Sequence, residues 1–262
     1  MYNRQEQKQE VKSLLRENQR FFFILFLPFL LIEIASSIVN SQSRLNDILS
    51  TEGSIKFSNT DILTTSASII VFSILAGIFL MGAFYTVFNV LRGKTDFQNP
   101  LRKSLTFIDN QRLFWGTVWV FILKIIILGL WLIVPSIVCG LLFLVPVVGA
   151  LIGSIGIIAT SVFLIIKTLA YSQAFWIYRD AFLENKPVSA YEAITLSNKM
   201  MYGYKSDMFV LQLSFIGWNI LVAITYGIVG LYVYPYYYIT LAKFYEFVKE
   251  QYKQDNTVLD VE

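Results

Sequence analysis

Residues 114–138 decide the fold of this chain, and they read FWGTVWVFILKIIILGLWLIVPSIV. This run contains one charged residue, Lys124, and it exceeds the roughly 20 residues that a helix needs to cross the hydrocarbon core of a bilayer. A backbone surrounded by lipid must satisfy its own hydrogen bonds, which a helix does within a single segment. The run therefore predicts a membrane-spanning helix.

Five other apolar runs of comparable length occur along the chain. They cover residues 21–39, 66–90, 151–177, 208–226 and 228–247. The first is interpreted as a retained span rather than a signal peptide, because its apolar stretch continues to spanning length. Charged residues make up only 15% of the chain, against about 25% in soluble domains. The sequence thus predicts an all-α polytopic bundle of six spans. A single membrane domain, residues 21–251, would lie between a basic N-terminal segment, 1–20, and a polar tail, 252–262.

Two connections between these spans need separate arguments. As one helix, residues 208–247 would be about 60 Å long, twice the hydrocarbon thickness. Gly227 and Gly230 lie at the centre of this region and predict a turn between two spans, and Pro235 is expected to bend the second. Residues 139–150 are apolar and contain Pro146. They are compatible with a tight external hairpin, an interfacial segment or a re-entrant turn.

Lysine and arginine positions predict the orientation. Seventeen of these residues lie in the N-terminal segment, in the loops 91–113 and 178–207, and from Lys243 to the C-terminus. The alternate loops hold only Arg44 and Lys56. Basic loops stay in the cytoplasm, so both termini are expected there, which requires an even number of spans.

Two segments outside the spans have sequence patterns that predict their structure. Residues 40–65 are rich in Ser, Asn, Asp and Thr and are expected to form a poorly packed outer loop. In the loop 178–207, Ser189 and Glu192 form a capping box that predicts a short helix ending near Gly203. An apolar stripe on this helix would consist of Ala193, Ile194, Met200 and Met201. The stripe favours an interfacial helix on the cytoplasmic membrane surface, and the alternative is a docking helix for a partner.

The residue types that are missing limit the chemistry. The chain has no histidine and one cysteine, Cys139, which argues against histidine-based catalysis, zinc sites and an internal disulfide. We therefore expect no enzyme, no cofactor and no metal. The net charge of +3 argues against a nucleic-acid partner. Acidic residues in the loop 178–207 show no calcium-loop spacing and are expected to be solvated. They are Asp180, Glu184, Glu192 and Asp207.

Three ionisable residues fall inside predicted spans: Glu33, Lys124 and Lys167. A charge at the bilayer centre costs about 2.5–3.5 kcal/mol on insertion scales, so each needs a partner or water. Glu33 and Lys124 are predicted near mid-depth and are the first pair to consider, either as a structural pair or as part of an ion path. Lys167 lies closer to the cytoplasmic side, where its ammonium could reach the interface.

Two further patterns have both a packing and a functional interpretation. Gly149-x-x-x-Gly153 with Gly156, and Ser73-x-x-x-Gly77, form small-residue faces typical of close helix packing; a flexible break in a transport helix is the alternative for the first. Tyrosines recur between residues 232 and 238. They favour an interfacial belt with packing over a groove for lipid or substrate.

From residue 193 onward the chain resembles the bacterial membrane proteins grouped as domain-of-unknown-function family 975. The residues that carry the resemblance are Ser197, Met201, Gly203, Ser214, Phe215, Gly217, Trp218, Thr225, Gly227, Gly230, Pro235, Tyr236, Phe244 and Tyr245. The stretch from Tyr171 to Ala174 and Asp180 extend it upstream. The chain differs from the usual pattern at Tyr204, where the family often has histidine, and in an extended 139–158 region. The resemblance implies a multi-span protein of the cytoplasmic membrane, mostly of Gram-positive bacteria, and supplies no activity.

Three functional hypotheses remain. The first is a non-enzymatic accessory that binds the bilayer and a membrane protein partner, a lipid or a second copy of itself. The second is a small transporter or channel that uses Glu33 and Lys124. The third, an intramembrane lipid-modifying enzyme, has the fewest candidate residues.

Overall fold

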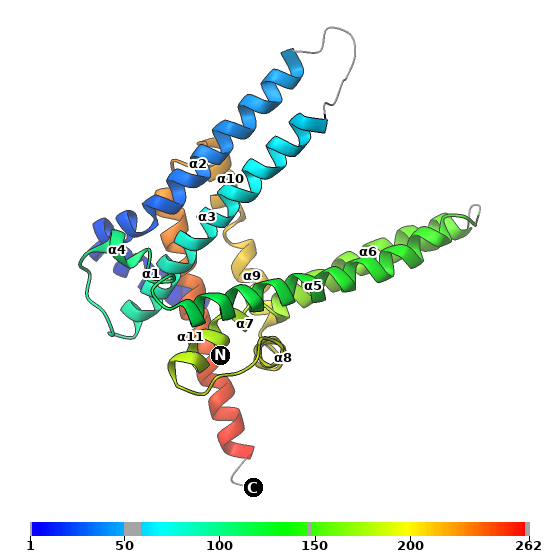
Figure 1. Ribbon diagram of the computed structural model, residues 1–262. Coiled ribbons are helices and arrows are strands. Elements are labelled where there is room, and N and C mark those ends of the chain that lie inside the picture. Colours follow the sequence, from blue (N-terminus) through cyan, green and yellow to red (C-terminus); the bar gives the residue numbers. More distant parts are fainter. Residues whose placement is uncertain (1, 50–58, 146–147, 260–262) are drawn as a thin grey trace. The chain divides into compact units, whose positions relative to one another are not determined.

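The computed structural model describes residues 2–49, 59–145 and 148–259, and within these ranges the chain is helical and contains no strand (Figure 1). The all-α class expected from the apolar runs is confirmed. The chain forms two compact units, one made of Met1–Asn110 with Ser214–Lys243 and the other of Gln111–Leu213 with Phe244–Glu262.

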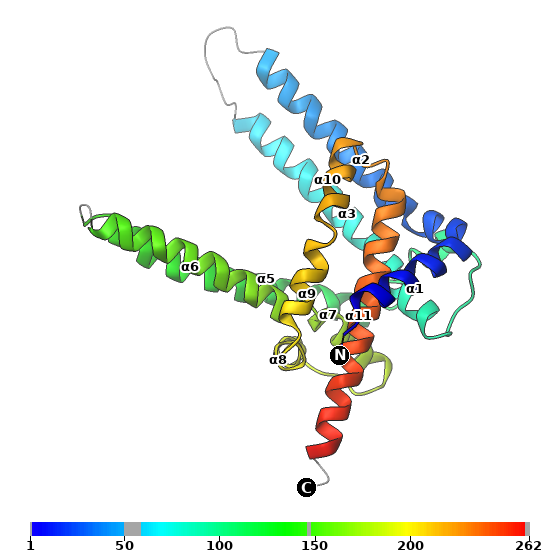
Figure 2. The same ribbon diagram turned by 180° about the vertical axis from the view of Figure 1, so that it is seen from behind.

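In the first unit the long helices α2 and α3 lie side by side (Figures 1 and 2). The helices of this unit are α1 (Arg4–Glu17), α2 (Gln19–Leu49), α3 (Asn59–Leu91), α4 (Pro100–Lys103), α10 (Ile216–Ile224) and the first half of α11 (Gly230–Leu259). Phenylalanines dominate the core, with Phe22 and Phe26 from α2 and Phe88 from α3 fully buried. Each aromatic ring buries a large area, so few side chains are needed to fill the core of this unit.

The segment between α3 and α5 folds back onto α3. Thr86 donates its hydroxyl to the carbonyl oxygen of Lys103 at 2.8 Å. A Cβ at Gly82 would lie 1.8 Å from the carbonyl oxygen of Ser104, so only glycine fits here. Close backbone approach explains why this α3 position lacks a side chain.

The second unit is built around a hairpin of α5 (Gln111–Leu142) and α6 (Val148–Ala170), which pack against each other (Figures 1 and 2). Shorter helices and the end of α11 complete the unit. They are α7 (Ala174–Leu183), α8 (Ala190–Met200) and α9 (Lys205–Leu213). A buried cluster near the α6–α7 junction includes Val120, Ala170 and Ile194 and brings α5, α6 and α8 together.

The connections agree with the turn predictions where the structure describes them. Gly227 has φ 90° and the preceding Tyr226 φ 50°, so a turn separates α10 from α11 as the glycines predict. Helix α5 continues to Leu142 and α6 begins at Val148, so residues 139–142 and 148–150 are helical. Pro146 in this connection lies outside the described residues.

Five helical segments are long and apolar enough to cross a membrane, among the residues described. They are Gln19–Val39, Ala67–Leu91, Gln111–Leu142, Leu151–Leu183 and Lys205–Ile224. They correspond to the first five predicted spans, so the chain is a polytopic membrane protein. Helix α11 is not among them, because its first half is rich in tyrosine and its second half in charge. A crossing by α11 stays a prediction, as do the single-domain limits at residues 21 and 251.

Several predicted boundaries were wrong by a few turns. Helix α2 continues to Leu49 and α3 begins at Asn59, so much of the loop expected at 40–65 is helical; residues 50–58 lie outside the described part. The span expected at 151–177 is interrupted after Ala170. The predicted span limits were placed at the polar residues that end each apolar run. A helix continues through such residues where a neighbouring helix continues beside it.

Candidate functional site

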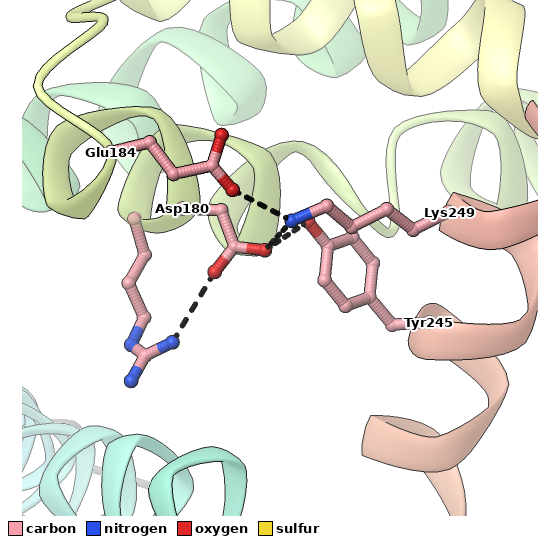
Figure 3. A network of polar contacts seen from close by, with 5 residues as sticks. Asp180, Glu184, Tyr245 and Lys249 are labelled. Carbon is pink, nitrogen blue, oxygen red and sulfur yellow. Dashed lines mark hydrogen bonds and ion pairs between the residues drawn. The ribbon is translucent and has the colours of Figure 1, made fainter. Parts of the chain in front are cut away.

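A charged network joins α7 to the second half of α11 within the second unit (Figure 3). Asp180 lies on α7 and Glu184 at the C-terminal cap of this helix, one turn further on, and Tyr245 and Lys249 lie one turn apart on α11, so each pair occupies one side of its helix. Asp180 Oδ2 accepts hydrogen bonds from Tyr245 Oη at 2.9 Å and Lys249 Nζ at 2.5 Å. Lys249 Nζ also reaches Glu184 Oε1 at 3.2 Å.

The inner part of this network is withdrawn from solvent. Arg179 Nη1 lies 3.3 Å from Asp180 Oδ1, and these two side chains are 2% and 5% exposed. Lys249 is 18% exposed and Glu184 53%, so the network runs from the interior to the surface.

Such an arrangement can hold α7 and the end of α11 together. Removing a charge from water costs several kcal/mol, which a pair recovers only with good geometry and further hydrogen bonds. Here the Asp180 carboxylate receives three donors from two helices. No group of three or more His, Cys, Asp or Glu side chains that could hold a metal ion occurs among the residues described.

The buried position of Asp180 and Arg179 corrects the expectation of a solvated acidic loop. Both lie inside α7 and are buried, whereas Glu184 and Glu192 are exposed as expected. Their partners Tyr245 and Lys249 are some 65 residues away in the sequence. A local pattern of charge therefore could not reveal the network.

Ser197 of α8 bridges the break between α6 and α7. Its hydroxyl donates to the Ala170 carbonyl oxygen at 2.7 Å and accepts from the Gln173 N–H at 3.1 Å. These backbone groups belong to the interruption after α6, where they lack regular helical partners. Ser197 is fully buried, so one hydroxyl replaces the missing helical bonds in the interior.

Helix α8 itself forms as the capping box predicts. Ser189 Oγ accepts from the Glu192 N–H, and the Glu192 carboxylate accepts from the Ser189 N–H at 2.7 Å. These hydrogen bonds lower the pKa of Glu192, the backbone bond contributing most. Gly203 adopts φ 85° just beyond the helix end.

The expected apolar stripe of α8 is covered by the protein. Ala193, Ile194, Met200 and Met201 are all buried, and α8 packs on α5 and α7. This stripe is therefore not available to the membrane surface or to a partner. A docking role for α8 would have to use its outer side, where Tyr191 is 64% exposed.

Lys167 lies among aromatic rings. Its Nζ is 5.2 Å from the ring centroid of Trp131, 5.3 Å from that of Phe163 and 5.8 Å from that of Tyr171. Cation–π contacts contribute about 0.5–2 kcal/mol each, more when water is excluded. They provide an intramembrane ammonium with a favourable environment between α5 and α6, which the sequence pattern did not suggest.

Glu33 and Lys124 belong to different units, Glu33 to the first and Lys124 to the second. Glu33 is exposed and Lys124 half-buried. Each unit is defined by its own internal contacts, so the pairing of these two residues stays a prediction.

In the first unit α1 packs on the aromatic residues of the family motif. Lys8 Nζ lies 2.5 Å from Ser214 Oγ and 4.2 Å above the centroid of the Phe215 ring, and Lys12 Nζ is 5.8 Å from the Tyr236 centroid. Burial lowers the pKa of Lys8, and the charges of Arg4 and Lys12 lower it further. Ser214 and Phe215 interrupt the helix between α9 and α10, so the span predicted at 208–226 is not one continuous helix.

The remaining motif residues divide between the two units. Trp218 packs against Tyr236, with ring centroids 6.4 Å apart, while Gly217 is exposed and Pro235 lies inside α11. Phe244 is fully buried and begins the part of α11 in the second unit. Within the run of tyrosines, Tyr238 contacts Phe84 at 4.3 Å between centroids and stacks on Phe26 at 5.8 Å, which places it in the core of the first unit.

The glycine face of α6 faces α5. Cβ atoms at Gly153 and Gly156 would lie 2.8 Å from the Phe143 ring and 2.5 Å from Cys139 Sγ. The packing interpretation of this face is therefore confirmed, and the packing is internal. At Gly77 on α3 nothing lies within 4 Å of the corresponding position, so the second small-residue face does not serve packing in this way.

Comparisons with known proteins identify the family and supply no activity. No curated protein and no solved structure matches the chain. The sequence matches the family described as "Protein of unknown function (DUF975)" over residues 1–252. This match extends the resemblance seen from residue 193 to nearly the whole chain, and with the apolar helices it identifies the protein as a polytopic membrane protein that belongs to family DUF975.

Proposed function

We propose that this chain is a non-enzymatic accessory protein of a bacterial cytoplasmic membrane, which binds a second membrane protein, a lipid or another copy of itself. Both termini would lie in the cytoplasm, as the distribution of Lys and Arg favours. The family resemblance favours a Gram-positive source. The binding surface would be the outer side of the α5–α6 hairpin.

The observation that carries this proposal is the exposure of that hairpin. In the two spans that contain α5 and α6, only 6% of the most apolar stretch is buried. The corresponding share in the other three spans is 22–28%. Large apolar side chains on both helices face outward, among them Leu130 at 57%, Ile155 at 66% and Ile158 at 65% exposed. Exposed apolar patches of this kind mark contact with lipid or with another protein.

The described polar groups give less support to transport or catalysis. The buried carboxylate of Asp180 is paired with Arg179 and Lys249. Lys167 is surrounded by aromatic rings, and Glu33 is exposed on α2. A transport path would instead be expected to line a polar interior with ionisable residues.

Photo-crosslinking in native membranes tests the proposal. A photoreactive amino acid at Leu130 or Ile158 should yield a discrete crosslinked product with a second protein or with lipid. The same group at Val120, which is 1% exposed, is the matched control and should crosslink only within the chain. Native mass spectrometry after gentle extraction would then identify the bound species.

The result that contradicts the proposal is equally definite. If Leu130 and Ile158 give no product beyond that of Val120, and the extracted chain carries neither protein nor lipid, the hairpin is not a binding surface. Ion flux in proteoliposomes that is lost in Lys124→Leu would then favour transport.

A further inference from the structure

The chain bends sharply between α1 and α2 (Figures 1 and 2). Helix α1 ends at Glu17, Asn18 has φ −122° and ψ 31°, and α2 begins at Gln19. A hollow open to solvent lies on this bend. It is lined by Arg16, Glu17, Gln19, Arg20, Phe23 and Ile24.

The lining of this hollow combines positive charge with apolar side chains. Arg16 and Arg20 contribute two exposed guanidinium groups against the single carboxylate of Glu17, and Gln19 adds an amide. Phe23 and Ile24, both half-buried, complete the lining. A guanidinium presents paired N–H donors that match two oxygens of a phosphate, and the apolar side chains suit the glycerol and upper acyl region of a lipid.

The position along α2 places this hollow at the level of the headgroups. The apolar run starts at Phe21, directly after Arg20. Residues 16–20 therefore lie where the hydrocarbon core ends, and Phe23 and Ile24 lie just inside it. A soluble anion needs only the two arginines, whereas an anionic lipid would use both parts of the hollow.

A regular series of cations explains why only the last two residues face the hollow. Arg4, Lys8, Lys12, Arg16 and Arg20 recur every fourth residue, and each step of four turns the side chain by about 40° around the helix axis. Lys8 and Lys12 lie over the rings of Phe215 and Tyr236. From Lys8 to Arg16 the series turns by about 80°, which takes Arg16 off the protein contact, and Arg20 lies beyond the bend, on α2.

We propose that this hollow binds the phosphate of an anionic phospholipid between the guanidinium groups of Arg16 and Arg20. This inference rests on the proposed function and names a lipid class and a place for it. The apolar side chains of Phe23 and Ile24 in the lining, and the start of the apolar run at Phe21, favour a lipid over free inorganic phosphate. Juxtamembrane cations each strengthen binding to anionic lipid, by about fivefold per residue at low salt.

Lipid binding by the purified full-length protein tests the inference. Affinity is measured for phosphatidylcholine and for phosphatidylglycerol, each added as single lipids to the protein in mild detergent. The double variant Arg16→Gln/Arg20→Gln should weaken the preference for phosphatidylglycerol about tenfold or more. The control Lys94→Gln/Arg102→Gln removes two exposed cations from the loop after α3 and should change it less than about twofold.

Three outcomes would overturn the inference. Equal losses in the two double variants would indicate general surface charge. An unchanged preference in Arg16→Gln/Arg20→Gln would remove the site, and displacement of the lipid by excess inorganic phosphate would indicate a soluble anion instead. If the glutamine variant does not fold, Arg16→Lys/Arg20→Lys keeps the charge and removes the paired donors; lowered affinity supports the site and unchanged affinity overturns it.

The photo-crosslinking result separates this inference from the proposed function. Loss of the lipid preference with intact crosslinks from Ile158 supports both. An unchanged lipid preference with intact crosslinks overturns only the site at the bend. Absence of crosslinks in the unmodified chain contradicts the function while leaving the lipid measurement interpretable.

Discussion

Two parts of the second unit are held together in different ways. One is the α5–α6 hairpin, and the other is built from α7, α8 and the end of α11. In the hairpin, two helices pack through glycines and aromatic rings and leave their outer sides apolar and exposed. In the α7–α8–α11 part, buried side chains bond to one another and to backbone groups through Asp180 and Ser197. Lipid can cover the first without specific contacts, whereas polar groups buried in the second require defined partners.

The strongest test of this contrast is Asp180→Asn. The substitution removes the anion that faces Arg179 and Lys249 and leaves excess positive charge in the interior. We expect the free energy of unfolding to fall by about 3–5 kcal/mol, measured by thermal or denaturant unfolding in detergent. The control Glu184→Gln alters the exposed end of the network and should cost less than about 1 kcal/mol. Equal effects in the two variants would mean that burial adds nothing to this network.

Ser197→Ala tests whether the interruption after α6 depends on one hydroxyl. The variant leaves the Ala170 carbonyl and the Gln173 N–H without that partner in the interior. A loss of about 1–3 kcal/mol is expected, with the same unfolding measurement. Ser161→Ala is the matched control, since its exposed hydroxyl bonds only within α6, to the Ile157 carbonyl. A Ser197 variant as stable as the control would show that the break forms without it.

Gly156→Ala tests the packing of the α5–α6 hairpin, again through the free energy of unfolding. The added Cβ would lie 2.5 Å from Cys139 Sγ, which creates strain of about 1–3 kcal/mol. The higher helix propensity of alanine offsets about 1 kcal/mol of it. A net loss near 1 kcal/mol is expected, and Cys139→Ala in the same chain should restore stability. Gly129→Ala, with nothing within 4 Å, should be neutral or stabilising; a loss there would show that the outer side is packed.

The smallest expected effect concerns the capping box of α8. The pKa of Glu192 in the folded state lies below its ordinary value of 4.5. Its contribution to stability is therefore present above about pH 4.5 and is lost as the pH falls through the lowered pKa. Glu192→Gln keeps an oxygen acceptor, so its stability should depend less on pH in this acid range. If the stability of the two proteins depended on pH in the same way, the Glu192 carboxylate would not be the group whose titration affects the cap.

The sequence predicted those parts of the fold that depend on local composition. Apolar runs located the first five spans, Ser189 and Glu192 located the start of α8, and Gly227 located the turn before α11. Each of these signals is contained within a few neighbouring residues or one uninterrupted run. The extension of α2 to Leu49 was missed because its polar residues resemble those of a loop.

Most of the candidate site could not be predicted from the sequence, because the residues that contact one another in it are distant in sequence. Asp180 gave no local sign that it would meet Tyr245 and Lys249. One usable signal existed, since spacings of four residues place two acids, Asp180 and Glu184, on one face and Lys249 beside Tyr245 on another. The break after Ala170 was missed as well, because Ser197, which completes it, lies on another helix.

The position of Cys139 has a consequence for kinetics. It is the chain's single cysteine, and its buried thiol lies at the contact between α5 and α6, beside Gly156. A thiol reagent can attack it only after the two helices separate. The rate of alkylation, compared with that of an unprotected thiol, therefore gives the fraction of time the hairpin is open. The native chain thus contains its own reporter for hairpin opening when a partner or lipid is added.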